Sequence, residues 1–116
     1  MNPRLLLIIA SDPRTSHRPA EAIRMAAGVG AWKRVDITLY LREAAVLVLG
    51  GETPDLVDEE NVARYLPNVA AFGRPIYVQS GARLLGKPDE TPLHFEEIDD
   101  AGLAALAANS NCVLRF

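Results

Sequence analysis

The polar turn after the first apolar run holds the side chains best suited to bind a ligand. Residues 11–17 read Ser-Asp-Pro-Arg-Thr-Ser-His and precede an expected helix start. Backbone N–H groups and the dipole at a helix start favour an anion, to which Arg14 or Arg18 can add charge. We therefore predict a small-anion site that includes Ser11, Asp12, Arg14, Ser16 and His17. The competing interpretation is that Ser11, Asp12 and Ser16 only satisfy turn and cap hydrogen bonds.

Other kinds of chemistry find little support in the sequence. Neither a G-x-S-x-G element nor a Walker phosphate loop is present. His17 has no second histidine or cysteine at ligand spacing, so we expect no metal site. We expect no cofactor either. The single thiol, Cys112, is expected at the amino end of a terminal strand, where a small core residue is the favoured interpretation.

Length and composition indicate one ordinary soluble domain. The chain has 116 residues, of which 49% are hydrophobic and 23% charged. A net charge of -3 without a Lys/Arg cluster argues against nucleic-acid binding. One cysteine cannot form an internal disulfide, and the first apolar run is too short for a signal peptide or a membrane span. We expect a cytoplasmic protein without a membrane segment.

The element that positions the polar turn is the run Leu5 to Ala10. Six uncharged apolar residues, ended by Ser11-Asp12-Pro13, predict a strand buried on both faces. Such a strand belongs inside a parallel sheet covered by helices on both sides. Ligands of these sheets bind outside the carboxyl ends of the strands, which is where the polar turn lies.

The rest of the chain alternates between further strands and helices. Gly28 and Gly30 form a GxG at a helix end, where they are interpreted as helix-terminating glycines and not as a dinucleotide fingerprint. Pro67 is expected to interrupt or kink its helix. Asp99 or Asp100 is expected to cap the last helix. Helices are predicted at 20–30, 57–71, 82–85 and after Asp100, and strands at 35–41, 76–78, 93–98 and 112–116; 44–49 is ambiguous between strand and helix.

The order of these segments resembles the DsrE/DsrF-like family of small sulfur-relay proteins, which includes TusD-like and YchN-like members. Four segments carry the resemblance: 6–13 with the Ala-rich helix after it, 37–41 leading into Ala45-Val46, 75–78 ending at Gly86, and 95–98 with the helix and strand that follow. It implies a flavodoxin-like three-layer α/β/α sandwich with a mostly parallel sheet of about five strands. It also implies homo-oligomers, trimers or hexamers, or sulfur-relay partner subunits. By the same resemblance, 44–49 is helical.

The residue that carries sulfur in this family is missing here. Sulfur-transferring members hold a persulfide on a cysteine just after the strand that matches 76–78. Aligning the closing glycine with Gly86 places that cysteine at Val78 and a second one at Gly81. The nearest polar side chains are Gln79 and Ser80, and a serine hydroxyl forms no persulfide.

Three hypotheses follow. The leading one is a non-catalytic, oligomeric member that binds a small anion or a partner subunit at the strand ends, using the turn at 11–17 together with Gln79, Ser80 and Gly81. The second is a sulfurtransferase whose persulfide sits on Cys112. The third is a purely structural subunit, in which the helix at 44–49 and Tyr65 face another copy.

Overall fold

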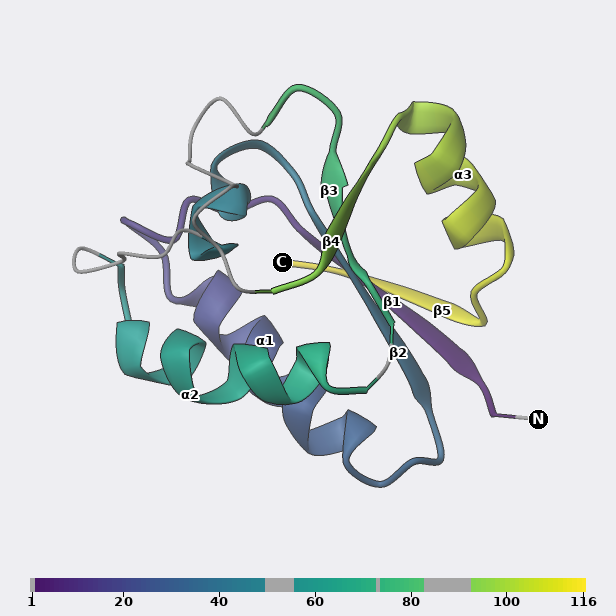
Figure 1. Ribbon diagram of the computed structural model, residues 1–116, viewed down its shortest axis with the longest axis horizontal. Coiled ribbons are helices and arrows are strands. Elements are labelled where there is room, and N and C mark those ends of the chain that lie inside the picture. The colour runs from purple at the N-terminus through teal and green to yellow at the C-terminus, as the bar shows by residue number, and fades with distance from the viewer. Residues whose placement is uncertain (1, 50–55, 73, 83–92) are drawn as a thin grey trace.

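The computed structural model describes residues 2–49, 56–72, 74–82 and 93–116, which contain five strands and four helices (Figure 1). The elements are β1 (Arg4–Ile9), α1 (Arg18–Gly30), β2 (Asp36–Leu41), the 3-10 helix η1 (Glu43–Leu49), α2 (Glu59–Ala70), β3 (Ile76–Gln79), β4 (Phe95–Ile98), α3 (Asp100–Ala108) and β5 (Cys112–Arg115). The predicted strands are confirmed with small shifts at their ends. The turn predicted at 82–85 lies outside the described residues, apart from Ala82.

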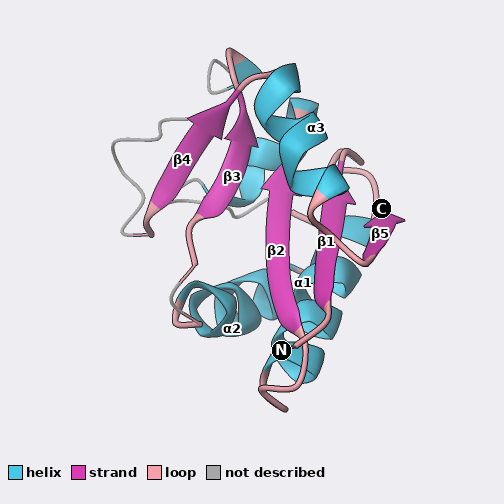
Figure 2. Ribbon diagram, turned by 90° about the vertical axis from the view of Figure 1, so that its right-hand side faces the viewer, coloured by secondary structure: helices cyan, strands magenta, loops and turns pink. Residues whose placement is uncertain are grey.

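The strands form one sheet in the order β4-β3-β2-β1-β5, and every neighbouring pair is parallel (Figure 2). The chain steps outward from β1 to β4 and then returns past β1 to β5. Connections between parallel strands are right-handed, so their direction across the sheet decides which face their helix covers. α1 and α2 connect strands in one direction and α3 connects strands in the other, so α3 lies on the opposite face. α1 and α2 cover one face and α3 the other, so the predicted three-layer sandwich is confirmed.

The first strand, β1, joins the two cores on either side of the sheet. It lies between β2 and β5, and Leu6, Leu7, Ile8 and Ile9 are at most 8% exposed. Since side chains alternate along a strand, Leu7 and Ile9 enter the core beneath α1 and α2. Leu6 and Ile8 pack with Tyr40 beneath α3. The uncharged sequence of this strand follows from burial on both faces, as predicted.

α1 and α2 pack closely because small residues lie between them and the sheet. Ala22 and Ala26 of α1 are fully buried. Gly30, the last residue of α1, lies so near the ring of Phe72 that a Cβ at this position would overlap the ring. The glycine that was interpreted as a helix end therefore also permits close packing with the segment after α2.

The expected break at Pro67 is not seen. Pro67 lies inside α2, which continues to Ala70. Pro67 and Ala63 are both exposed. Pro67 has no N–H to donate to the carbonyl of Ala63, four residues earlier. Because this side of the helix is exposed, water can bind that carbonyl instead, so the proline is tolerated near the helix end.

The segment 44–49 is helical, as the resemblance implied, and forms η1. Little of this segment is exposed for contact with a second copy, although Tyr65, the other residue of that hypothesis, is half-buried. Ala45, Val46, Val48 and Leu49 are at most 6% exposed within the single chain, where they join the core beneath α1 and α2. Apolar residues that pack against their own sheet are not available to a neighbouring molecule.

α3 rests on its face of the sheet without being enclosed. Asp99 has extended backbone and accepts the N–H of Gly102 at 2.8 Å, which confirms the predicted cap. Leu103, Leu106 and Ala107 contact the Leu6, Ile8 and Tyr40 cluster but are only half-buried. The outward side consists of exposed alanines: Ala101, Ala104, Ala105 and Ala108.

Within the described ranges, none of the helices combines the length and the apolar character that crossing a membrane requires.

Candidate functional site

Asp12 organises the turn that follows β1. Its carbonyl accepts the N–H groups of Thr15 and Ser16 at 3.2 and 2.9 Å, and its Oδ1 accepts the N–H of Arg14 at 2.9 Å. Ser11 donates its own N–H to the carbonyl of Phe116 at 3.3 Å. These contacts give Asp12 the turn-forming role of the competing interpretation.

The Asp12 carboxylate also forms a two-pronged ion pair with Arg14. Nη2 lies 2.8 Å from Oδ2, and Nε lies 3.0 Å from Oδ1. The hydrogen bonds and charge of Arg14 lower the pKa of Asp12 below its usual range, and Asp12 raises the pKa of Arg14. Both groups are ionised at neutral pH and balance one another. The guanidinium that was expected to attract an anion is therefore already neutralised.

The start of α1 offers few free donors. Ser16 Oγ accepts the N–H of Arg18 at 3.1 Å, Pro19 has no N–H, and Glu21 donates its N–H to the carbonyl of His17. The His17 ring lies 3.9 Å from the Glu21 carboxylate, and both side chains are exposed. Ser16 thus satisfies the backbone N–H of Arg18 at the start of the helix, whose N-cap residue is His17, and an anion site at this helix start stays a prediction.

The second predicted group lies at the end of β3. Gln79 Oε1 accepts the N–H of Glu43 at 3.0 Å, which ties this strand to the start of η1. The N–H of Ser80 donates to the carbonyl of Ile98 at 3.0 Å, while the residue itself is exposed. Gly81 has a φ of 86°, a left-handed conformation that favours glycine. The turn therefore presents Ser80 to solvent at the carboxyl end of the strand.

The two predicted groups share one edge of the sheet but do not touch. β1 and β3 run parallel with β2 between them, so their carboxyl ends lie on the same side. Among the residues that the structure describes, no hydrogen bond or ion pair joins the turn at 11–17 to Gln79, Ser80 or Gly81. The predicted site is thus two separate clusters on one edge.

The position at which the alignment expects the sulfur-carrying cysteine is a core position. Val78 is 2% exposed and pairs with Leu41 and Glu97 in the sheet. Ser80, two residues further on, is the side chain that the same turn exposes. A thiol at this edge of the sheet would have to lie near position 80 to contact a sulfur donor or a sulfur acceptor.

Cys112 lies far from that edge. It begins β5 and pairs with Leu5, near the amino end of β1, so it is at the opposite end of the sheet, as predicted. The expectation of a core cysteine is wrong, because Cys112 is exposed. β5 is an edge strand, and α1 packs on β1 and β2, which leaves Cys112 and Leu114 exposed on one face of β5, while Val113 packs beneath α3.

One unusual group, the hydroxyl of Tyr40, had no signal in the sequence. Tyr40 is fully buried beneath α3, and its Oη has no hydrogen-bond partner among the described residues. Burial and the nearby Asp100 charge raise the pKa of Tyr40, while Arg42 acts in the opposite direction. Buried tyrosines usually find a partner. The strand pattern of 35–41 could have placed Tyr40 inward, but not the absence of a partner.

The parts of the chain that the structure covers contain no cluster of three or more potential metal-ligating side chains.

Comparison with known proteins supports the fold independently of these details. No family model matches the sequence, and no curated protein sequence matches it. The solved structure of the YchN protein from E. coli is similar to this chain, with a TM-score of 0.79 and 21% sequence identity over the full length of both. At that identity the likeness concerns the fold, which is the fold implied by the sequence resemblance. The chain has the YchN-like α/β fold, and its likeness to the DsrE/DsrF-like proteins is shown at the level of the fold.

Proposed function

We propose that this chain is a non-catalytic DsrE/DsrF-like subunit, which has the scaffold of the sulfur-relay proteins without their thiol chemistry. One observation carries the proposal. The sole cysteine of the 116-residue sequence lies at the amino end of β5, whereas the family's persulfide belongs at the carboxyl end of the strand that matches β3. The exposed residue at that end is Ser80, whose hydroxyl cannot hold a persulfide.

The function of the carboxyl edge is then non-covalent binding. Because Gln79 uses its carbonyl oxygen to bind Glu43, the amide nitrogen is left to donate to a ligand. The Ser80 hydroxyl stands beside it on the exposed turn. Donors of this kind suit a small anion or the backbone carbonyls of a partner subunit.

We include homo-oligomerisation in the proposal, and the surface that supports it is α3. After Asp100 this helix is apolar around its whole circumference, and four of its alanines, 101, 104, 105 and 108, are exposed. Helices of that composition are normally buried. A second copy that covers this side, in a trimer or a hexamer, would supply the burial that the single chain does not.

A sulfur-transfer assay tests the proposal. The protein is incubated with a persulfide donor, desalted, examined by intact mass and offered cyanide as sulfur acceptor. We expect no turnover, with wild type and Cys112→Ser indistinguishable in thiocyanate release. The double variant Cys112→Ser/Ser80→Cys is the positive control, because its thiol is exposed at the carboxyl edge and should take up one sulfur.

The alternative function is sulfur transfer through Cys112, and the exposure of that thiol favours it. Repeated thiocyanate release by the wild type that is absent in Cys112→Ser would establish this alternative and contradict the non-catalytic proposal. A single sulfur adduct on Cys112 without turnover would reflect exposure alone.

A further inference from the structure

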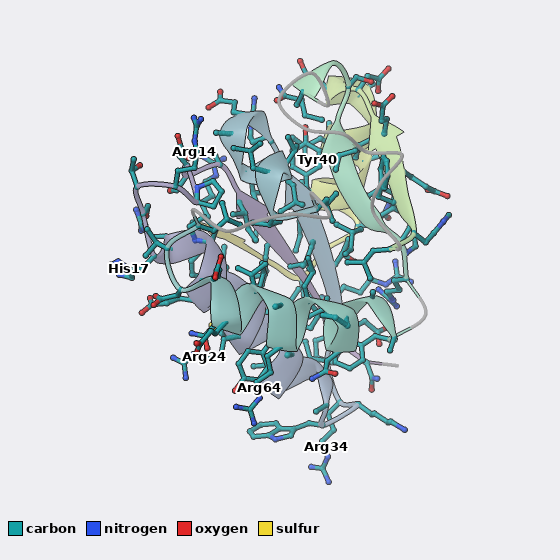
Figure 3. The ribbon with its side chains drawn as sticks, turned by 60° about the vertical axis from the view of Figure 1, so that its left-hand side comes forward. Arg14, His17, Arg24, Arg34, Tyr40 and Arg64 are labelled. Atoms are coloured by element: carbon teal, nitrogen blue, oxygen red, sulfur yellow. The ribbon has the colours of Figure 1, made fainter. Side chains whose placement is uncertain are left out.

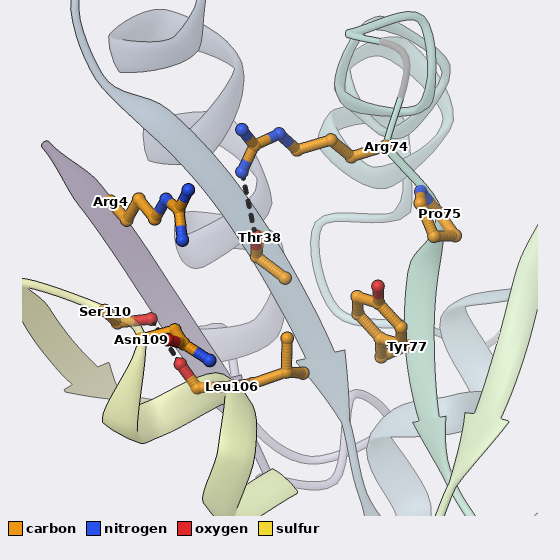
Figure 4. A pocket seen from close by; sticks show the side chains of 8 residues that line it. All are labelled: Arg4, Thr38, Arg74, Pro75, Tyr77, Leu106, Asn109 and Ser110. Carbon is orange, nitrogen blue, oxygen red and sulfur yellow. Dashed lines mark hydrogen bonds between the residues drawn. The ribbon is translucent and has the colours of Figure 1, made fainter. Parts of the chain in front are cut away.

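The amino half of the sheet face beneath α3 contains a polar cavity. α3 has nine residues and is therefore about 13 Å long, so it covers only the part of the face that carries Leu6, Ile8 and Tyr40. Arg4 and Thr38 lie on the same face, nearer the amino ends of β1 and β2. A cavity of about 240 Å³ opens over them (Figure 4).

Two guanidinium groups enter this cavity from opposite sides. Figure 4 shows Arg4 and Arg74 reaching toward Thr38 from the two flanks of β2. Arg74 is fixed by Asp36, with 2.8 Å between Nη2 and Oδ2, and its Nη1 lies 3.5 Å from the Thr38 hydroxyl oxygen. The Arg4 guanidinium has no ion-pair or hydrogen-bond partner among the described residues.

The two arginines and Asp36 together leave the cavity with one excess positive charge. Asp36 neutralises Arg74, and the described residues that line the cavity include no carboxylate. The carboxyl end of α3, which would oppose an anion, is covered by side-chain donors. Asn109 Nδ2 binds the carbonyl of Ala105 at 2.9 Å, and Ser110 Oγ binds that of Leu106 at 2.7 Å.

The remaining walls are apolar. The Tyr77 ring and the Leu106 side chain face the cavity from β3 and α3 (Figure 4). The volume is below the range of about 300–1,000 Å³ typical of sites for drug-sized molecules. A single excess positive charge fits a monoanion better than a phosphate dianion, and planar guanidinium groups bind carboxylates in a two-pronged manner.

We propose that this cavity binds a small organic monocarboxylate, with its carboxylate between Arg4 and Arg74 and a flat apolar body against Tyr77 and Leu106. The site lies at the amino end of the sheet, opposite the strand ends where the predicted ligand site lies. It is independent of the sulfur-relay proposal.

Benzoate is the probe that tests the site, titrated into ¹⁵N-labelled protein by NMR. Benzamide has the same shape without the charge, and inorganic phosphate has charge without the apolar body. We expect benzoate to shift the amide signals around Thr38, Tyr77 and Ser110 in a saturable way, with benzamide and phosphate at least about tenfold weaker. Because the titration measures benzoate binding and not sulfur transfer, and because Ser80 lies at the opposite end of the sheet, the result does not depend on the sulfur-transfer assay.

Substitutions identify the groups that bind. Arg4→Gln should weaken benzoate binding at least about tenfold with an otherwise unchanged spectrum, because the side chain is exposed and unpaired among the described residues. Arg24→Gln on the exposed side of α1 removes the same charge elsewhere and should leave the affinity unchanged. Equal binding of benzamide, equal loss in both variants, tighter binding of phosphate, or the absence of saturable shifts would each overturn the proposal.

Discussion

The ring of Phe72 fills the space into which a Cβ at Gly30 would project. Gly30 ends α1, and Phe72 follows α2 by two residues, so this contact sets how closely the two helices approach at one end. Gly28, two residues earlier, is exposed, and a Cβ added there would meet no neighbouring side chain within 4 Å. The two glycines of the GxG therefore differ in physical role.

Alanine substitutions should separate these roles. Gly28→Ala should raise the free energy of unfolding by about 0.5–1 kcal/mol, because alanine loses less backbone entropy in a helix. Gly30→Ala should lower it by about 1 kcal/mol, since the added methyl group must displace the Phe72 ring. Urea unfolding of the two variants beside the wild type measures both changes.

The contact itself is tested by removing the ring. In a Phe72→Ala background, Gly30→Ala should become neutral or stabilising, while the effect of Gly28→Ala should not change. If Gly30→Ala destabilises the protein equally with and without the ring, the clash is not its cause.

The α3 cap gives a second prediction. Asp99→Ala should lower the free energy of unfolding by about 0.5–2 kcal/mol, because the N–H of Gly102 loses its acceptor. Asp99→Asn keeps a side-chain oxygen at the cap and is the matched control, expected to remain near the wild type. Similar losses in both variants would assign the effect to charge and not to the cap.

Much of the fold could be predicted from the sequence because its signals are local or periodic. An uncharged run such as 5–10 has few alternatives to a doubly buried strand, and Asp99 caps the helix after it through a contact three residues away. The burial of Cys112 was wrongly predicted because it depends on which strand lies at the sheet edge and on what α1 covers. Neither the position of the strand in the sheet nor the area that α1 covers can be inferred from the sequence around residue 112.

The amino-end cavity could not be predicted, since its residues are brought together by the sheet. Arg4 and Arg74 are far apart in sequence and meet because β1 and β3 flank β2. The turn at 11–17 was recognised as polar, but its ion pair was not. Whether Arg14 is free or paired depends on the rotation of one carboxylate two residues away.

The Asp12/Arg14 pair predicts a measurable shift. Arg14→Gln should raise the pKa of Asp12 part of the way toward the ordinary value of about 3.9, because the side-chain hydrogen bonds and charge of Arg14 are removed while the backbone N–H at position 14 still donates to Oδ1. A lowered carboxyl pKa stabilises the folded state above the unfolded pKa, and that contribution is lost as pH falls through the folded pKa. Carbon NMR titration of the Asp12 carboxylate makes the measurement, with Arg18→Gln as control. An unchanged pKa in Arg14→Gln would contradict the pairing.

The proposed oligomer is tested on the exposed side of α3. Ala105→Glu places a charge among the solvent-facing alanines and should shift the protein toward monomer in sedimentation velocity, if a second copy covers this side. Ala63→Glu, on the exposed side of α2, is the matched control and should leave the distribution unchanged. Monomeric wild-type protein, or an assembly that survives Ala105→Glu, would contradict this surface.

The hydroxyl of Tyr40, a residue labelled in Figure 3, is buried without a hydrogen-bond partner among the described residues and predicts an unusual response to truncation. Tyr40→Phe should leave the free energy of unfolding unchanged or raise it by up to about 1 kcal/mol, because a buried hydroxyl without a partner costs desolvation energy. Tyr77→Phe removes a half-buried hydroxyl from the neighbouring strand and should change stability by less than about 0.5 kcal/mol. A loss above about 1 kcal/mol in Tyr40→Phe would show that the hydroxyl is bound, for example by a buried water.

The same residue predicts how stability depends on alkaline pH. Burial raises the pKa of Tyr40 in the folded state, so above about pH 10 the unfolded chain releases this proton while the folded chain still holds it. Stability attributable to Tyr40 is complete below the unfolded pKa and falls as pH rises toward the folded pKa. Urea unfolding between pH 9 and about pH 11 should therefore show a steeper decline for the wild type than for Tyr40→Phe. Parallel declines would mean that Tyr40 ionises equally in both states, which its burial beneath α3 opposes.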